Sequence, residues 1–241
     1  MQFRHLGFAS LLLALVASPA LAHFVWVAVE KDSSGQPTAK VWFSELAEPD
    51  VAKLLDKVTA VKVWTRQGTE KPSELKLTKQ VSGELGALVS AVPAGTSNLS
   101  AHLKYGVVTR REQTMLLHYF AKYLDGTADN LKQFGRDEGL ALDVVPQLAD
   151  GGIELQVLYQ GKPVAGSDVV VLDGDGNETD HKTAADGRVK IAGAKPGLYS
   201  IRAKWVVMEA GKDGDQEYPQ VSNYCTLALR MPGSNVKPNA P

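Results

Sequence analysis

The chain has 241 residues and a single cysteine, Cys225. One cysteine excludes a disulfide framework and a cysteine-based zinc or iron–sulfur site within one chain. An excess of one charge is also missing, since 26 lysines and arginines stand against 27 aspartates and glutamates. A nucleic-acid-binding protein would carry a clear positive excess, so we expect no nucleic-acid partner. The 44% apolar and 22% charged residues are typical of a folded globular protein.

The familiar catalytic motifs are missing too. The sequence has no Gly-x-Ser-x-Gly, no His-Glu-x-x-His and no glycine-rich phosphate loop. Residues 173–177 (DGDGN) copy the start of a calcium-binding EF-hand loop, but Glu178 and Ala184 stand where that loop needs glycine and glutamate. We interpret this segment as a hairpin turn. The sequence therefore predicts no catalytic residue and no small-molecule substrate, and it favours a binding protein over an enzyme.

Residues 1–22 have the pattern of a secretory signal peptide. The basic Arg4 precedes an apolar run over residues 6–16, and Ala20-Leu21-Ala22 is a small-x-small cleavage site. The run is too short for a membrane span, which needs about 20 residues, and no later stretch is apolar enough. We expect a periplasmic or secreted protein with no integral membrane span after cleavage; an uncleaved anchor is the alternative.

Cleavage after Ala22 would make His23 the first residue of the mature protein. Its α-amine, with an ordinary pKa of about 8, and its imidazole could then chelate one metal ion together. A second histidine would complete the arrangement called a histidine brace. The alternative is that a histidine follows the cleavage site by chance.

The rest of the chain alternates apolar and polar residues in short runs separated by turn residues, which is typical of β-strands. The spacing predicts one short helix over residues 49–58, and residues 114–124 fit a helix as well as a strand. We predict an all-β fold of two immunoglobulin- or transthyretin-like antiparallel β-sandwich modules. Their expected bounds are residues 23–148 and 149–232, with a disordered tail over residues 233–241.

The second half contains a phrase that resembles the small sandwich modules related to transthyretin and the carboxypeptidase regulatory domain. The phrase consists of residues 161–166 (GKPVAG), 183–188 (TAADGR) and 195–199 (KPGLY). Its Asp-Gly and Pro-Gly pairs are turn signals. The resemblance implies a scaffold and carries no chemistry of its own.

A wider resemblance covers nearly the whole mature chain. Its segments are His23-Phe24-Val25-Trp26, Trp42-Phe43-Ser44-Glu45, residues 102–107 (HLKYGV), residues 118–123 (HYFAKY) and residues 142–146 (LDVVP). Together they resemble a bacterial family of exported proteins of unknown function, some of which are described as periplasmic components of nickel and cobalt uptake systems. The resemblance implies a periplasmic protein that handles a transition metal. A membrane metal transporter would be its partner.

Imidazole is a usual ligand of nickel, copper and zinc, so the remaining histidines are candidates. His102 shares the polar face of a predicted strand, whereas His118 lies in an apolar run. We predict that His23 binds one divalent transition metal, with His102 or His118 as the further ligand. Nickel or cobalt is expected; copper is the alternative, because an amine–imidazole chelate suits its tetragonal field. The competing interpretations are a surface His102, a core His118 and a structural or interaction module without a metal.

Overall fold

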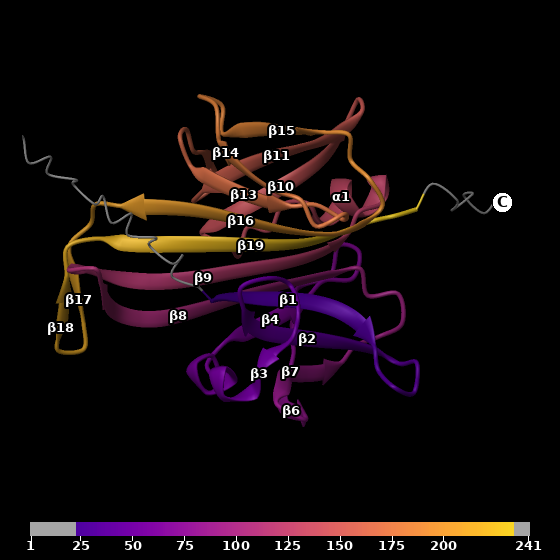
Figure 1. Ribbon diagram of the computed structural model, residues 1–241, viewed down its shortest axis with the longest axis horizontal. Helices are drawn as coiled ribbons and strands as arrows, with labels where there is room; N and C mark the ends of the chain where they lie inside the picture. The colour runs from indigo at the N-terminus through magenta and orange to yellow at the C-terminus, as the bar shows by residue number, and fades with distance from the viewer. Residues whose placement is uncertain (1–22, 234–241) are drawn as a thin grey trace, which may run out of the picture.

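The computed structural model describes residues 23–233. The predicted signal peptide, residues 1–22, lies outside the described residues, and so does the predicted tail apart from Gly233. Strands dominate the described part, and their sheets pack face to face, which confirms the predicted all-β sandwich (Figure 1). No helix within residues 23–233 has the length and apolar character that a membrane span requires.

An eight-stranded sheet runs through the middle of the molecule. Its strands, in spatial order, are β14 (Glu178–Lys182), β13 (Asp168–Leu172), β16 (Gly197–Val207), β19 (Val221–Met231), β9 (Gln113–Asp125), β8 (Asn98–Arg110), β4 (Lys62–Thr65) and β5 (Ser73–Glu74). The two halves of the chain meet where β9 and β19 pair in parallel, from Leu116 opposite Val221 to Asp125 opposite Arg230. Both halves therefore contribute to one continuous sheet.

Two smaller sheets cover the two faces of this central sheet (Figure 1). The N-terminal sheet contains β1 (Phe24–Lys31), β2 (Pro37–Ser44), β7 (Leu85–Ala91), β3 (Asp50–Val51) and β6 (Thr78–Ser82). The C-terminal sheet contains β10 (Leu142–Ala149), β11 (Gly152–Tyr159), β12 (Lys162–Pro163) and β15 (Arg188–Ala192). The predicted module boundary at residues 148–149 falls in the β10–β11 hairpin, so a strand of the first predicted module lies in the sheet of the second.

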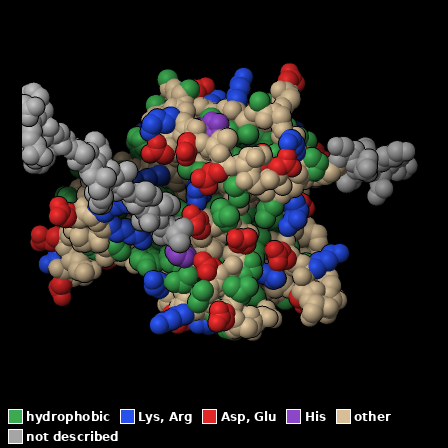
Figure 2. Space-filling view, in the orientation of Figure 1, with side chains coloured by type: hydrophobic (Ala, Val, Ile, Leu, Met, Phe, Trp, Pro, Cys, Tyr) green, Lys and Arg blue, Asp and Glu red, His purple; other side chains and the backbone are tan. Residues whose placement is uncertain are grey.

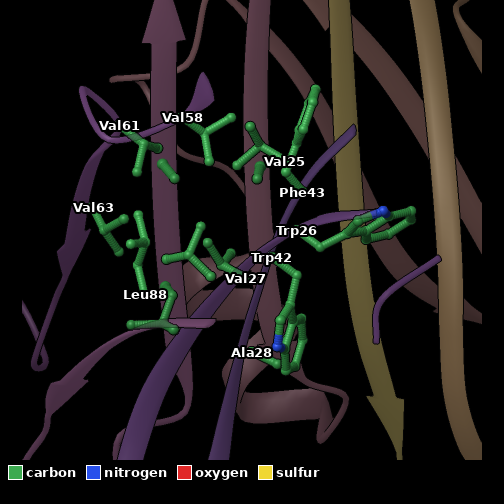
Figure 3. Packing of buried hydrophobic residues seen from close by; sticks show 14 of the residues in the cluster. Val25, Trp26, Val27, Ala28, Trp42, Phe43, Val58, Val61, Val63 and Leu88 are labelled. Carbon is green, nitrogen blue, oxygen red and sulfur yellow. The ribbon is translucent and has the colours of Figure 1, made fainter. Parts of the chain in front are cut away.

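The central strand β9 serves both cores through the alternation of its side chains. Tyr119 and Ala121 pack into the cluster that includes the N-terminal sheet, with the buried Trp26 and Trp42 (Figure 3). Phe120 packs into the cluster that includes the C-terminal sheet. Consecutive residues of β9 thus face different layers of the molecule.

A buried ion pair connects the central and C-terminal sheets. Lys122 of β9 contacts the carboxylate of Asp143 of β10, and the two side chains are 1% and 3% exposed. Lys122 also donates to the carbonyl of Gly135 at 2.5 Å, and Asp143 accepts from the backbone N–H of Asp137 at 2.9 Å. These partners satisfy both charges where water does not reach them.

Local structure differs from the predictions in a few places. Residues 49–58 form β3 and a 3-10 helix (Ala52–Lys57) that has no side-chain cap. Residues 114–124 are strand because β9 has a hydrogen-bonded partner on each side. Sequence reasoning missed α1 (Ala128–Phe134), which Thr127 caps, and the hairpin of β17 (Gly211–Asp213) and β18 (Gln216–Tyr218). The EF-hand-like segment is the β13–β14 turn, as expected.

Candidate metal site

Two of the predicted ligands lie side by side on the central sheet. His102 of β8 and His118 of β9 are 16 residues apart in sequence, yet His102 Nε2 and His118 Nδ1 are 3.0 Å apart. Their ring planes differ by 9°. The register explains the contact, because His102 is opposite Phe120 and Lys104 is opposite His118, which makes the two histidines diagonal neighbours on one face.

Both imidazoles are half-buried and lie against Phe120, whose ring is 4.7 Å from that of His102 between centroids. Burial, together with the charges of His102 and Lys104, lowers the pKa of His118 to about 4. Burial and the charge of Lys62 also lower the pKa of His102. Both rings are therefore neutral at neutral pH, with one nitrogen donating to the other, and neutral imidazole is the form that binds metals.

Three charged side chains surround the pair. Lys62 of β4 is opposite His102, and Lys104 of β8 is opposite His118. Lys104 Nζ donates to Asp213 Oδ1 at 2.6 Å, which ties the β17–β18 hairpin to this face. A β-bulge interrupts β8 between Lys104 and Gly106, and Gly106 adopts a φ of 105° that favours glycine.

His23 lies on the other face of the central sheet. Its Nε2 is 3.1 Å from Asp50 Oδ2, and its carbonyl accepts from the Tyr119 hydroxyl at 3.2 Å. Its ring is 5.7 Å from that of Phe43 between centroids. Tyr119 and His118 are consecutive residues of one strand, so β9 separates His23 from the histidine pair. The structure brings His102 and His118 together and leaves His23 apart from them.

No group of three or more His, Cys, Asp or Glu side chains within residues 23–233 is arranged to hold a metal ion. His181, which we did not predict as a ligand, lies on β14 and contacts the Thr179 hydroxyl. Cys225 is fully buried and burial raises its pKa to about 12, so it stays a thiol. The two-imidazole pair is accordingly the strongest donor set among the described residues, and the role of each histidine as a ligand stays a prediction.

Sequence reasoning missed the carboxylates that accompany the histidines. Asp50 follows a proline in a segment expected to be helical, and Asp213 lies in a polar stretch with no strand-like alternation. Only the acidic character of residues 209–217 could have drawn attention to Asp213. Over the face shown in Figure 2, acidic and basic side chains are interspersed, in keeping with the net charge of -1.

Comparison with known proteins yields one family. No curated protein matches the chain. Among solved structures, the crystal structure of a tetra-tandem repeat in the extending region of a large adhesion protein aligns with 87% of this chain at 14% identity and a TM-score of 0.20. The chain spans 50% of that structure's length, and so low a TM-score supports no structural or functional argument. The family model for a domain of unknown function, DUF4198, matches residues 20–207, and the chain therefore belongs to the DUF4198 family.

Proposed function

We propose that this protein is exported to the periplasm and binds a divalent transition metal through His102 and His118. Nickel or cobalt is the proposed metal, with copper as the alternative. One observation carries the proposal: two neutral, half-buried imidazoles from neighbouring strands present nitrogens 3.0 Å apart.

The spacing of the two nitrogens fits a shared metal ion. Bonds from imidazole nitrogen to such a metal are about 2.0–2.1 Å long, so two ligands at right angles lie about 2.9 Å apart. His102 Nε2 and His118 Nδ1 are 3.0 Å apart before any metal binds. The contact with Phe120 limits how far the His102 ring can turn. To hold the ion, the ring that donates the hydrogen bond would carry its proton on its other nitrogen, so that both facing nitrogens present a lone pair to the metal.

His23 supports a second, separate site in this proposal. After cleavage at residue 22 its α-amine is free, and the contact of Nε2 with Asp50 leaves Nδ1 as the ring nitrogen that can act together with the amine. A carboxylate on the distal nitrogen is the usual way to orient a ligating histidine. We therefore assign His23 a site of its own on the opposite face of the sheet, in place of a shared one.

The proposed biological role is to hold nickel or cobalt in the periplasm and deliver it to a membrane metal transporter. Two exposed lysines beside the pair weaken its hold on a cation, because like charges repel. Weakened binding suits a protein that must release its metal. An enzyme is a poorer candidate, because the sequence lacks the familiar catalytic motifs.

Calorimetric titration of the protein purified from the periplasm tests the proposal, with nickel, cobalt and copper(II) chlorides as probes. His102→Ala and His118→Ala should each weaken one binding event by more than the ~10–100-fold expected for changes around a site. His181→Ala is the control and should bind like the wild type. Equal binding by all four proteins, or no binding below the millimolar range, would overturn the proposal.

A further inference from the structure

We propose that Asp213 is the third protein ligand of the metal at His102 and His118, and that Lys104 competes with the metal for its carboxylate. This inference rests on the proposed function. Two imidazoles and one carboxylate form a recurrent ligand set for divalent transition metals that leaves open positions. In the structure the described residues offer only the two imidazoles, because Lys104 holds Asp213.

The first argument is position. Lys104 is directly opposite His118 across the β8–β9 ladder, and the two side chains share a face. Asp213 Oδ1 is 2.6 Å from Lys104 Nζ, and the β17–β18 hairpin that carries Asp213 packs against β8 and β9.

The second argument is that the carboxylate can change partner. Lys104 and Asp213 are 50% and 29% exposed, and an exposed ion pair of this kind is weak. Asp213 ends a three-residue strand in a hairpin of two such strands, and an isolated pair of short strands has little stability of its own. A divalent ion, with twice the charge of an ammonium group, would therefore draw Asp213 away from Lys104.

The third argument is the comparison with Lys62. Lys62 and Lys104 are both exposed, and each is opposite one histidine of the pair. Each lowers the pKa of that histidine through its charge. Of these two lysines, only Lys104 forms an ion pair within the described residues. Replacing Lys62 therefore measures only the repulsion between a lysine and the metal. Replacing Lys104 measures that repulsion together with the release of Asp213.

The experiment measures nickel and cobalt(II) affinity by calorimetry on the full mature protein. Variants are Asp213→Ala, Lys104→Met, Lys62→Met and the double variant Lys104→Met with Asp213→Ala. Asp215→Ala is the matched control, because it removes an acidic residue from the same hairpin. The visible absorption of bound cobalt(II) is the second readout, since its bands depend on the ligand set, and circular dichroism checks that each variant is folded.

We expect Asp213→Ala to weaken binding about 10- to 100-fold and to change the cobalt spectrum, with Asp215→Ala unchanged. In the wild-type protein, Lys104→Met should tighten metal binding about threefold more than Lys62→Met does. In the double variant, where Asp213 is already alanine, Lys104→Met should give no such additional tightening. An unchanged affinity and spectrum in Asp213→Ala, or an additional tightening that survives in the double variant, would overturn the inference. The proposed function stands without Asp213 if His102→Ala and His118→Ala lose metal binding in the same titrations. If these two variants bind the metal like the wild type, the proposed function fails as well.

Discussion

His118 and Tyr119 are consecutive residues of β9, and they take part in different sites. The Tyr119 hydroxyl donates to the carbonyl of His23 at 3.2 Å, whereas the His118 ring lies 3.0 Å from His102 on the other face of the sheet. A strand cannot turn both side chains to one side. A metal bound by His23 would therefore be a different ion from one bound by the histidine pair.

This separation predicts how an N-terminal extension acts. In the proposed mature protein, which begins at His23, one added glycine moves the α-amine away and leaves the ring in place. We expect binding by His23 to weaken strongly, while binding by His102 and His118 stays unchanged. Copper titration of the extended and authentic proteins measures both events. Parallel loss of both events in the extended protein would show that the three histidines act as one site.

The Asp50 contact leads to a second prediction. Asp50→Ala removes the carboxylate that faces His23 Nε2 at 3.1 Å and frees that nitrogen to compete with Nδ1 for the metal. Copper affinity at His23 should fall about 10- to 100-fold, as for other carboxylates that orient a ligating histidine. Asp56→Ala is the control, because Asp56 forms an exposed pair with Lys79 and has no contact with a histidine. Equal loss in both variants would point to a general charge effect.

Stability should depend on pH through His118. Its pKa is about 4 in the folded protein against an ordinary value of 6.5, so the unfolded chain binds a proton more readily. The free energy of unfolding should therefore fall as pH drops below about 6.5 and stop falling through this group near pH 4. Urea denaturation at a series of pH values measures it. His118→Gln should show a shallower decline, and an identical decline would assign the effect to other groups.

The buried pair between the sheets predicts a large stability effect. Lys122→Met leaves the Asp143 carboxylate buried without its cation, which costs about 3–5 kcal/mol in comparable pairs. Lys182→Met breaks an exposed pair with Asp168, whose side chains are 69% and 60% exposed, and should cost less than about 1 kcal/mol. Urea unfolding compares the two variants. Similar losses would show that Lys122 contributes little beyond its packing.

The sequence predicted the all-β class because alternation of apolar and polar residues is typical of strands. It could not predict that His102 meets His118. That contact depends on the register of the β8–β9 hairpin, whose turn is formed by Arg111 and Glu112 at φ values of 46° and 66°. Asparagine and glycine usually mark such a turn, and neither is present.

The position of His23 could not be predicted from the sequence either. Its place follows from the packing of β1 on the Tyr119 face of β9, where Phe24 contacts Tyr119. Such packing joins segments about 95 residues apart, and no local pattern records it. The same holds for Asp213, which reaches Lys104 across a gap of 109 residues in the chain.

The pairing of β9 with β19 also fixes the order in which the protein can be completed. β19 (Val221–Met231) is the last strand within residues 23–233, yet it lies between β9 and β16 in the middle of the sheet. Until it has been synthesised, the edge of β9 has no partner, and strands from the two halves cannot form one sheet. An unpaired strand edge invites pairing with other chains. A nascent or truncated chain that lacks β19 would therefore be prone to aggregation, and one that has it can close that edge.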